Sequence, residues 1–183
     1  MRETNVKHIQ EIERLKYSGL YADAKTKVHE YLLQHADDYR LYEELADIWL
    51  YEGDLDAAES ALKVAQKLFP ESATGMYLMG FIHISKSNFR IGVELLEKAN
   101  ELFPNNPEIL RNLGWGYAML GNPSKGVAVM KRALNLAPDD ELIMEDLGVT
   151  LISEGDIEEG ASMLKKAGKE SRLDELKTMM GMN

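Results

Sequence analysis

The residue types that could support catalysis or metal binding are few in this sequence, and they lie far apart. The chain has no cysteine, which excludes disulfides, thiol chemistry and thiolate metal ligands. None of its four histidines, His8, His29, His35 and His83, has the four-residue spacing with a glutamate that a helical zinc site uses. The chain also lacks a Gly-x-Ser-x-Gly nucleophile motif and a phosphate-binding loop. We therefore expect a protein that is not an enzyme and that holds no metal and no cofactor.

Carboxylates are abundant, but their positions favour a role in helix capping. The run Asp139-Asp140-Glu141 lies where a helix is expected to begin, and the helix dipole favours acids there. The net charge of −10 opposes binding to nucleic acid, which relies on Lys and Arg to neutralise phosphates. The basic pairs Lys131-Arg132 and Lys165-Lys166 are short and isolated. We expect no nucleic-acid binding, and the acidic surplus suits a protein or peptide partner with basic flanks.

The elements that must position any functional residue recur along the chain with a fixed period. Three series of residues recur at an interval of 34 positions: Pro70, Pro104 and Pro138; Gly80, Gly114 and Gly148; and Ala65, Ala99, Ala133 and Ala167. A period of this length indicates an array of helix-turn-helix repeats that bury their apolar faces against one another.

The residues inside each period resemble the tetratricopeptide repeat family. The fourth copy carries Leu113-Gly114, Tyr117, Met130 and Pro138 in the places that the family pattern requires. It departs from the pattern at Gly126, where the family has Ala, and at Leu110, where the family has Trp. The resemblance covers five repeats in register, at 5–38, 39–72, 73–106, 107–140 and 141–174.

The resemblance implies an all-α, right-handed solenoid of five helix hairpins, with residues 1–183 as a single superhelical domain. Ser171 begins a sequence typical of a capping box, so we expect a short closing helix at about 173–181. No apolar run approaches the roughly 18 residues that a membrane span requires. The first residues contain no apolar stretch typical of a secretory signal. We therefore expect a cytoplasmic protein that does not insert into membranes.

Glycines occupy two positions that face each other in the family fold, where the two helices of a hairpin cross. The pairs in repeats three to five are Gly80 with Gly92, Gly114 with Gly126, and Gly148 with Gly160. Contact without side chains lets two backbones approach closely. We therefore predict tighter hairpins in these repeats than in the second repeat, which has Ala46 and Ala58.

In tetratricopeptide arrays, the first helix of each repeat lines a concave groove in which partners usually bind. Trp, Tyr and Arg are enriched at interface hot spots. The resemblance therefore implies that Tyr77, Phe81, Arg111 and Trp115 anchor an apolar segment or a helix of a partner. The full predicted partner-binding set is Tyr77, Phe81, Ile84, Arg111, Asn112, Trp115, Met119, Asp47 and Tyr51.

Several alternatives stay open at the level of sequence. Strong curvature of the array would pack these aromatic rings against one another without a ligand. The family's clamp for chaperone tails is absent, because Asn112 alone fills a place in its Lys, Asn and Arg pattern. The favoured function is a non-catalytic interaction scaffold. The alternatives are a homo-oligomer that assembles through its first or last helix, and a secretion-type chaperone that shields an apolar segment of its cargo.

Overall fold

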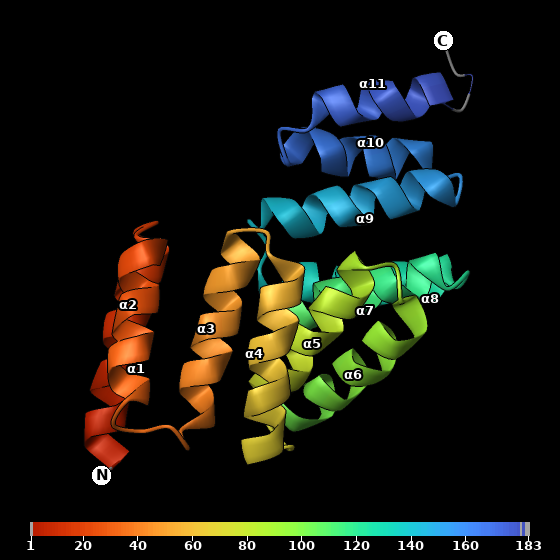
Figure 1. Ribbon diagram of the computed structural model, residues 1–183. Coiled ribbons are helices and arrows are strands. Elements are labelled where there is room, and N and C mark those ends of the chain that lie inside the picture. The colour runs from red at the N-terminus through yellow and green to blue at the C-terminus, as the bar shows by residue number, and fades with distance from the viewer. Residues whose placement is uncertain (1, 180, 182–183) are drawn as a thin grey trace. The chain divides into compact units, whose positions relative to one another are not determined.

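The computed structural model describes residues 2–179 and residue 181, and every regular element among them is an α-helix (Figure 1). The prediction of an all-α protein is therefore confirmed for the described residues. The helices are α1 (Arg2–Tyr17), α2 (Tyr21–Leu32), α3 (Tyr39–Tyr51), α4 (Leu55–Leu68), α5 (Ala73–Ser85), α6 (Phe89–Leu102), α7 (Pro107–Met119), α8 (Pro123–Leu136), α9 (Glu141–Ser153), α10 (Ile157–Lys166) and α11 (Glu170–Met179).

The 34-residue period appears directly in the helix boundaries, because α3, α5, α7 and α9 begin at positions 39, 73, 107 and 141. Local capping explains these starts. The side chain of Asp38 accepts a hydrogen bond from the backbone N–H of Arg40, and Asn106 caps α7 in the same way. Pro107 is the first residue of α7, where a missing N–H costs little. The helix starts are therefore encoded in local sequence.

The turn inside each hairpin needs a residue with a positive φ angle. Gly53 supplies it in the second repeat with φ 80°. In the third repeat the equivalent residue is Ser87, which takes φ 60°, while its neighbour Asn88 keeps φ −85°. A non-glycine residue in this region is strained, because its Cβ atom crowds the following carbonyl. The turn therefore holds Ser87 in a left-handed backbone conformation that serine disfavours.

Packing divides the chain into two compact units, Met1–Ile82 and His83–Asn183, which we call the N-terminal unit and the C-terminal unit. In the N-terminal unit, α1 packs on α2, α2 on α3, α3 on α4, and α1 also packs on α3. In the C-terminal unit, consecutive helices from α6 to α11 pack on one another, and α7 also packs on α9. The single solenoid over residues 1–183 and its five repeat boundaries stay predictions.

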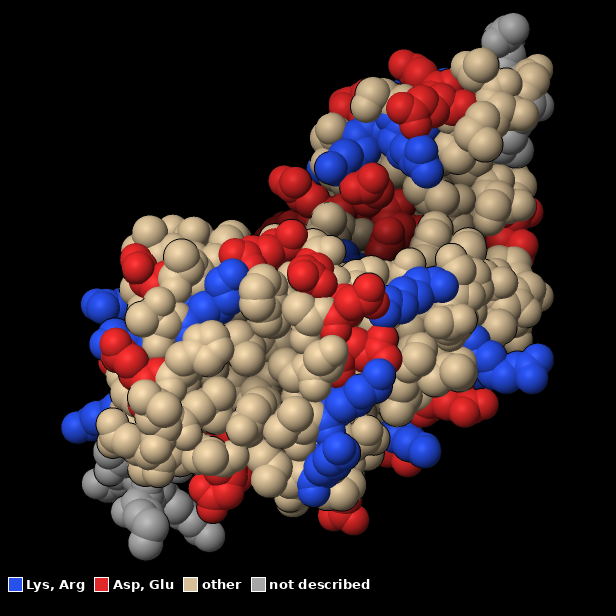
Figure 2. Space-filling view, viewed as in Figure 1, with Lys and Arg blue, Asp and Glu red and all other residues tan. Residues whose placement is uncertain are grey.

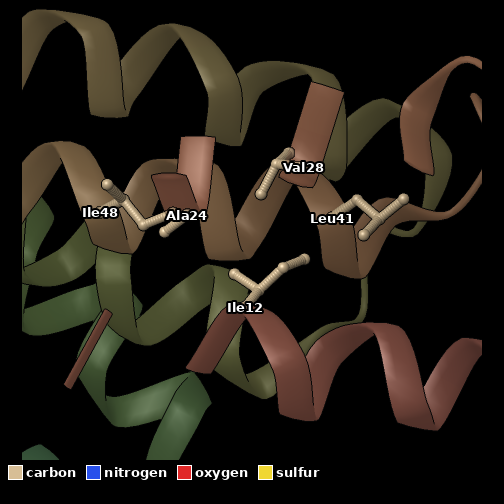
Figure 3. Packing of buried hydrophobic residues seen from close by; sticks show 5 residues of the cluster. All are labelled: Ile12, Ala24, Val28, Leu41 and Ile48. Carbon is tan, nitrogen blue, oxygen red and sulfur yellow. The ribbon is translucent and has the colours of Figure 1, made fainter. Parts of the chain in front are cut away.

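The core of the N-terminal unit joins three helices. Ile12 of α1, Ala24 and Val28 of α2, and Leu41 and Ile48 of α3 point toward one another (Figure 3) and are at most 1% exposed. Burying each of the larger side chains contributes about 1.5–3 kcal/mol. This cluster holds α1 beside α3 and so fixes the spacing of their polar side chains.

The C-terminal unit confirms the close helix crossing at two glycine pairs. A Cβ atom added to Gly114 would lie 2.9 Å from the carbonyl oxygen of Gly126, and one added to Gly126 would lie 2.5 Å from the oxygen of Gly114. A Cβ atom on Gly148 would likewise lie 2.9 Å from the oxygen of Gly160. The backbones of α7 and α8, and of α9 and α10, meet where no side chain fits. Whether these hairpins are tighter than the second repeat stays a prediction.

The closing helix begins earlier than the sequence predicted. Helix α11 starts at Glu170 rather than at about 173, so Ser171 lies inside the helix and is not its cap. The reason is Gly168, whose φ of +67° ends α10 and returns the chain immediately into a new helix. Leu173 is 3% exposed and packs with Ile152 and Leu164, which seals the end of the unit. Position 180, inside the predicted range, lies outside the described residues.

Among the described residues, no helix is both long enough and apolar enough to span a bilayer.

Candidate functional site

The predicted partner-binding residues lie on the first helix of three repeats and are distributed over both compact units. The N-terminal unit contains Asp47 and Tyr51 on α3, and Tyr77 and Phe81 on α5. The C-terminal unit contains the rest of the set: Ile84, Arg111, Asn112, Trp115 and Met119. Within a unit the structure brings α1 beside α3 and α7 beside α9, so polar contacts can form across neighbouring first helices.

An ion network joins α1 to α3 in the N-terminal unit. The ammonium of Lys16 donates to Glu44 Oε2 at 2.7 Å and to Asp47 Oδ2 at 2.5 Å, and the Lys16 side chain is 2% exposed. Burial alone would lower the pKa of Lys16, but the two carboxylates outweigh it and raise that pKa. Asp47, a predicted partner-binding residue, is therefore already engaged by Lys16.

The sequence placed Asp47 in the predicted partner-binding set, but it did not predict that Asp47 pairs with Lys16. They lie 31 residues apart, close to one repeat length, on the first helices of consecutive repeats. Opposite charges at such positions are the signal that could have predicted the pair.

A second polar contact joins α7 to α9 in the C-terminal unit. Arg111 Nε lies 3.8 Å from Asp146 Oδ2, and the two side chains are 18% and 32% exposed. Burial raises the pKa of Asp146 to about 6, although the nearby Arg111 guanidinium lowers it. The buried Nε atom of Arg111 has no hydrogen-bond partner among the described residues. Arg111 therefore retains an unused donor on the face formed by α7 and α9.

The other predicted residues of the C-terminal unit differ in how much surface they present. Met119 is 42% exposed and Trp115 is half-buried. Asn112 is 6% exposed and donates through Nδ2 to the carbonyl of Glu108, while Ile84 is also 6% exposed. Ile84 and Asn112 therefore present little surface, and their role in binding stays a prediction.

Two side chains at the position of the family's tyrosine show contrasting environments. Tyr117 is 8% exposed and donates to Glu97 Oε1 at 2.5 Å, with the ammonium of Lys125 3.6 Å from its ring centre. His83 is half-buried, and its Nδ1 atom has no hydrogen-bond partner within the described part of the chain. Both side chains pack into the helices, as this position implies.

The described residues contain no group of three or more His, Cys, Asp or Glu side chains that could hold a metal ion. On the face shown in Figure 2, acidic and basic side chains of the described residues are interspersed, without an extended basic area. The chemistry of these surfaces is therefore that of hydrogen bonds, ion pairs and apolar contacts.

Comparison with known proteins agrees with this architecture. Residues 10–73 match the family model described as Tetratricopeptide repeat. No curated protein gives a significant sequence match to the chain.

Solved structures extend the likeness in fold to most of the chain. The pilF protein of Pseudomonas aeruginosa is 15% identical, with a TM-score of 0.77, over 99% of this chain and 86% of that one. TTC0263, a thermophilic TPR protein of Thermus thermophilus, is 22% identical, with a TM-score of 0.72, over 92% and 94%. MamA of Desulfovibrio magneticus RS-1 is 19% identical, with a TM-score of 0.70, over 90% and 93%.

Stacked helical repeats of this kind present extended surfaces to other proteins, so the fold is one that interaction scaffolds use. The 34-residue interval of the helix starts, the glycine crossings in the hairpins and the family match over residues 10–73 agree with one another. Residues 10–73 therefore match the tetratricopeptide repeat family, and the rest of the chain resembles solved proteins of that fold.

Proposed function

We propose that the protein is a non-catalytic scaffold that holds a segment of a partner protein against the first helices of its repeats. In the C-terminal unit this surface consists of Arg111, Trp115 and Met119 on α7, with Leu142 and Asp146 on α9. We call it the α7–α9 face. Leu142 is 54% exposed and Met119 is 42% exposed, so large apolar side chains on both helices are open to a partner.

The observation that carries this proposal is the state of Arg111. Its buried Nε donor lacks a hydrogen bond, and an unsatisfied buried donor costs about 1–3 kcal/mol. The Asp146 carboxylate, at 3.8 Å, lies outside hydrogen-bond distance. If the Arg111 side chain turns outward, a carbonyl or carboxylate of a bound segment would satisfy this donor, and an apolar side chain of the same segment would cover Trp115. Arginine and tryptophan are two of the residue types that dominate interface energies.

The test compares partner capture by the wild type with capture by Arg111→Glu/Trp115→Ala. The matched control is Arg90→Glu/Phe103→Ala, which makes the same charge reversal and a comparable aromatic-to-alanine change on exposed residues of the C-terminal unit, in α6 and just after it. Circular dichroism establishes that each variant is folded. We expect quantitative mass spectrometry of affinity-purified material to show prey lost with the first variant and retained with the control. Retention of the prey by the first variant would exclude the α7–α9 face.

Self-assembly is the second candidate, and exposed apolar residues at the ends of second helices favour it. In the C-terminal unit, Leu102, Phe103 and Leu136 are 52%, 55% and 46% exposed. Contacts between copies would remove this apolar surface from water. Sedimentation equilibrium over a concentration series tests this candidate, which predicts a mass that rises with concentration and falls in Arg90→Glu/Phe103→Ala.

A further inference from the structure

The N-terminal unit carries exposed aromatic side chains at the end where α1 and α3 stop. Tyr17 is the last residue of α1 and is 71% exposed, and Tyr51 is the last residue of α3 and is 51% exposed. Leu20, in the turn after α1, is 48% exposed. Helices α1 and α3 pack on each other, so these side chains lie at one edge of the unit. We call Tyr17, Leu20 and Tyr51 the aromatic edge.

Packing holds Tyr51 of the aromatic edge in place. The ring of Tyr51 stacks on Tyr21, the first residue of α2, with ring centres 5.8 Å apart and an interplanar angle of 21°. Tyr21 in turn packs against the buried cluster around Ile12. A ring fixed in this way loses little conformational entropy when a ligand covers it.

Charge distinguishes this edge from an ordinary apolar patch. The ammonium of Lys16 lies 5.1 Å from the ring centre of Tyr17, but it is neutralised by contacts with Glu44 and Asp47. Glu13, also on α1, adds a third carboxylate to the field at the Tyr17 hydroxyl. Glu44, Asp47 and Glu13 carry three negative charges against the positive charges of Lys16 and Arg14 in the last turn of α1, which leaves a local charge of about −1 when all are ionised.

The raised pKa of the Tyr17 hydroxyl agrees with this negative field. Lys16 lowers the pKa of Tyr17, yet burial together with Asp47, Glu13 and Glu44 raises it above the ordinary value. Lys25 and Glu52 add no net charge near this end, because they pair at 2.7 Å while Lys25 lies over the Trp49 ring. A ligand at the aromatic edge therefore meets aromatic faces in a negative field.

The ligand that fits the aromatic edge is a cation that can also stack on an aromatic ring. A guanidinium group satisfies both conditions, because it is planar, always charged and weakly hydrated, whereas an ammonium is compact and strongly hydrated. We propose that the aromatic edge binds an arginine side chain in a protein segment, with an apolar neighbour of that arginine covering Leu20. This inference rests on the proposed function as an interaction scaffold, but it concerns a surface separate from the α7–α9 face.

The test is an NMR titration of the isotope-labelled full chain with a blocked heptapeptide of alanine and leucine that carries one central arginine. The same peptide with citrulline, a neutral isostere, and with lysine are the comparisons. We expect shifts at Tyr17, Leu20 and Tyr51 with the arginine peptide, weaker shifts with lysine and none with citrulline. The affinity should fall as salt is raised, because the carboxylates are partly exposed.

Variants make the test specific to this edge. Tyr17→Ala should weaken binding of the arginine peptide about fivefold, the loss expected for an exposed cation–π contact. Leu33→Ala, which removes an 88% exposed apolar side chain elsewhere in the same unit, should leave the binding unchanged. Arg111→Glu/Trp115→Ala should also leave it unchanged, so a failure of the α7–α9 face and a failure of the aromatic edge are told apart.

Three outcomes would overturn the inference. Equal shifts with the citrulline peptide would show that charge plays no part. Undiminished binding by Tyr17→Ala would place the arginine elsewhere. Shifts at the aromatic edge that depend on protein concentration without peptide would identify a second copy of the chain as its occupant.

Discussion

At the scale of single residues, the buried ammonium of Lys16 stabilises the contact between α1 and α3. Replacing it by methionine leaves Glu44 and Asp47 without their cation, and their side chains are 16% and 27% exposed. Breaking a fully buried pair costs about 3–5 kcal/mol, and partial exposure reduces this, so we expect Lys16→Met to cost about 2 kcal/mol. Urea denaturation at pH 7 measures the loss.

The control for Lys16 is Lys63, which pairs with Glu59 on the surface of α4 with its side chain 61% exposed. Lys63→Met should change the free energy of unfolding by less than about 0.5 kcal/mol. Equal effects of the two substitutions would mean that burial of the Lys16 network contributes nothing to stability.

Asp146 gives a prediction about pH. Its pKa in the folded protein, raised to about 6 by burial, lies above the ordinary aspartate value of 3.8. The folded state therefore binds this proton more tightly, and the contribution of Asp146 to stability rises as the pH falls through about 6. Discounted for partial exposure, wild type should gain about 1 kcal/mol relative to Asp146→Asn between pH 7 and pH 5.

Carboxyl NMR measures this titration directly. Arg111→Met should raise the pKa of Asp146 further, because Arg111 is the cation that lowers it. A midpoint near 4 in wild type would show that water reaches Asp146 freely and that the α7–α9 face is more open than the structure indicates.

At the scale of elements, the crossing of α7 and α8 depends on Gly126. An alanine there gains about 1 kcal/mol of helix propensity, but its Cβ would lie 2.5 Å from the carbonyl oxygen of Gly114. Overpacking should cost about 3 kcal/mol here, the upper end of its usual range, because the clash is with rigid backbone, so Gly126→Ala should destabilise the protein by a net amount of about 2 kcal/mol. Thermal unfolding measures this. At the exposed Ala128 of the same helix, the reverse change to glycine should cost about 1 kcal/mol, which isolates propensity from packing.

The hairpin turn between α5 and α6 gives the opposite prediction. Ser87 has φ 60°, whereas Gly121 occupies the equivalent turn of the next repeat with φ 81°. Because left-handed geometry costs a non-glycine residue about 1–2 kcal/mol, Ser87→Gly should stabilise the protein by about 1 kcal/mol, and Gly121→Ser should destabilise it by a similar amount. Chemical denaturation of both variants measures the two changes, and changes of the same sign would contradict the explanation from backbone geometry.

At the scale of the whole molecule, each compact unit has its own buried cluster. Ile12→Ala creates a cavity at a fully buried position in the N-terminal unit and should lower the free energy of unfolding by about 2–5 kcal/mol. Because stability in repeat arrays depends on neighbouring repeats, we expect hydrogen exchange to accelerate over residues 2–82 and to change little over most of residues 83–179. Equal acceleration along the entire chain would instead support the single cooperative solenoid that the sequence predicted.

Much of the fold was predictable because its determinants are local. Asp38 and Asn106 cap helices through their own side chains, and Gly53 ends one through its own φ angle. A constant repeat length then copies these signals at the same spacing along the chain. The closing helix was predicted three residues too late, because Gly168 was a stronger signal than the capping sequence at Ser171.

The sequence by itself therefore determined the all-α class and the 34-residue period, since these follow from side-chain type and helix geometry, and it predicted which residues line the first helices. Only the tertiary structure decided which of those residues meet. Lys16 pairs with Asp47, Arg111 lies beside Asp146 without a full hydrogen bond, and Asn112 is buried. The two ion contacts join residues about one repeat apart. They depend on how far one first helix is displaced along the next. That displacement is set by packing of the core between the helices, which no local pattern encodes.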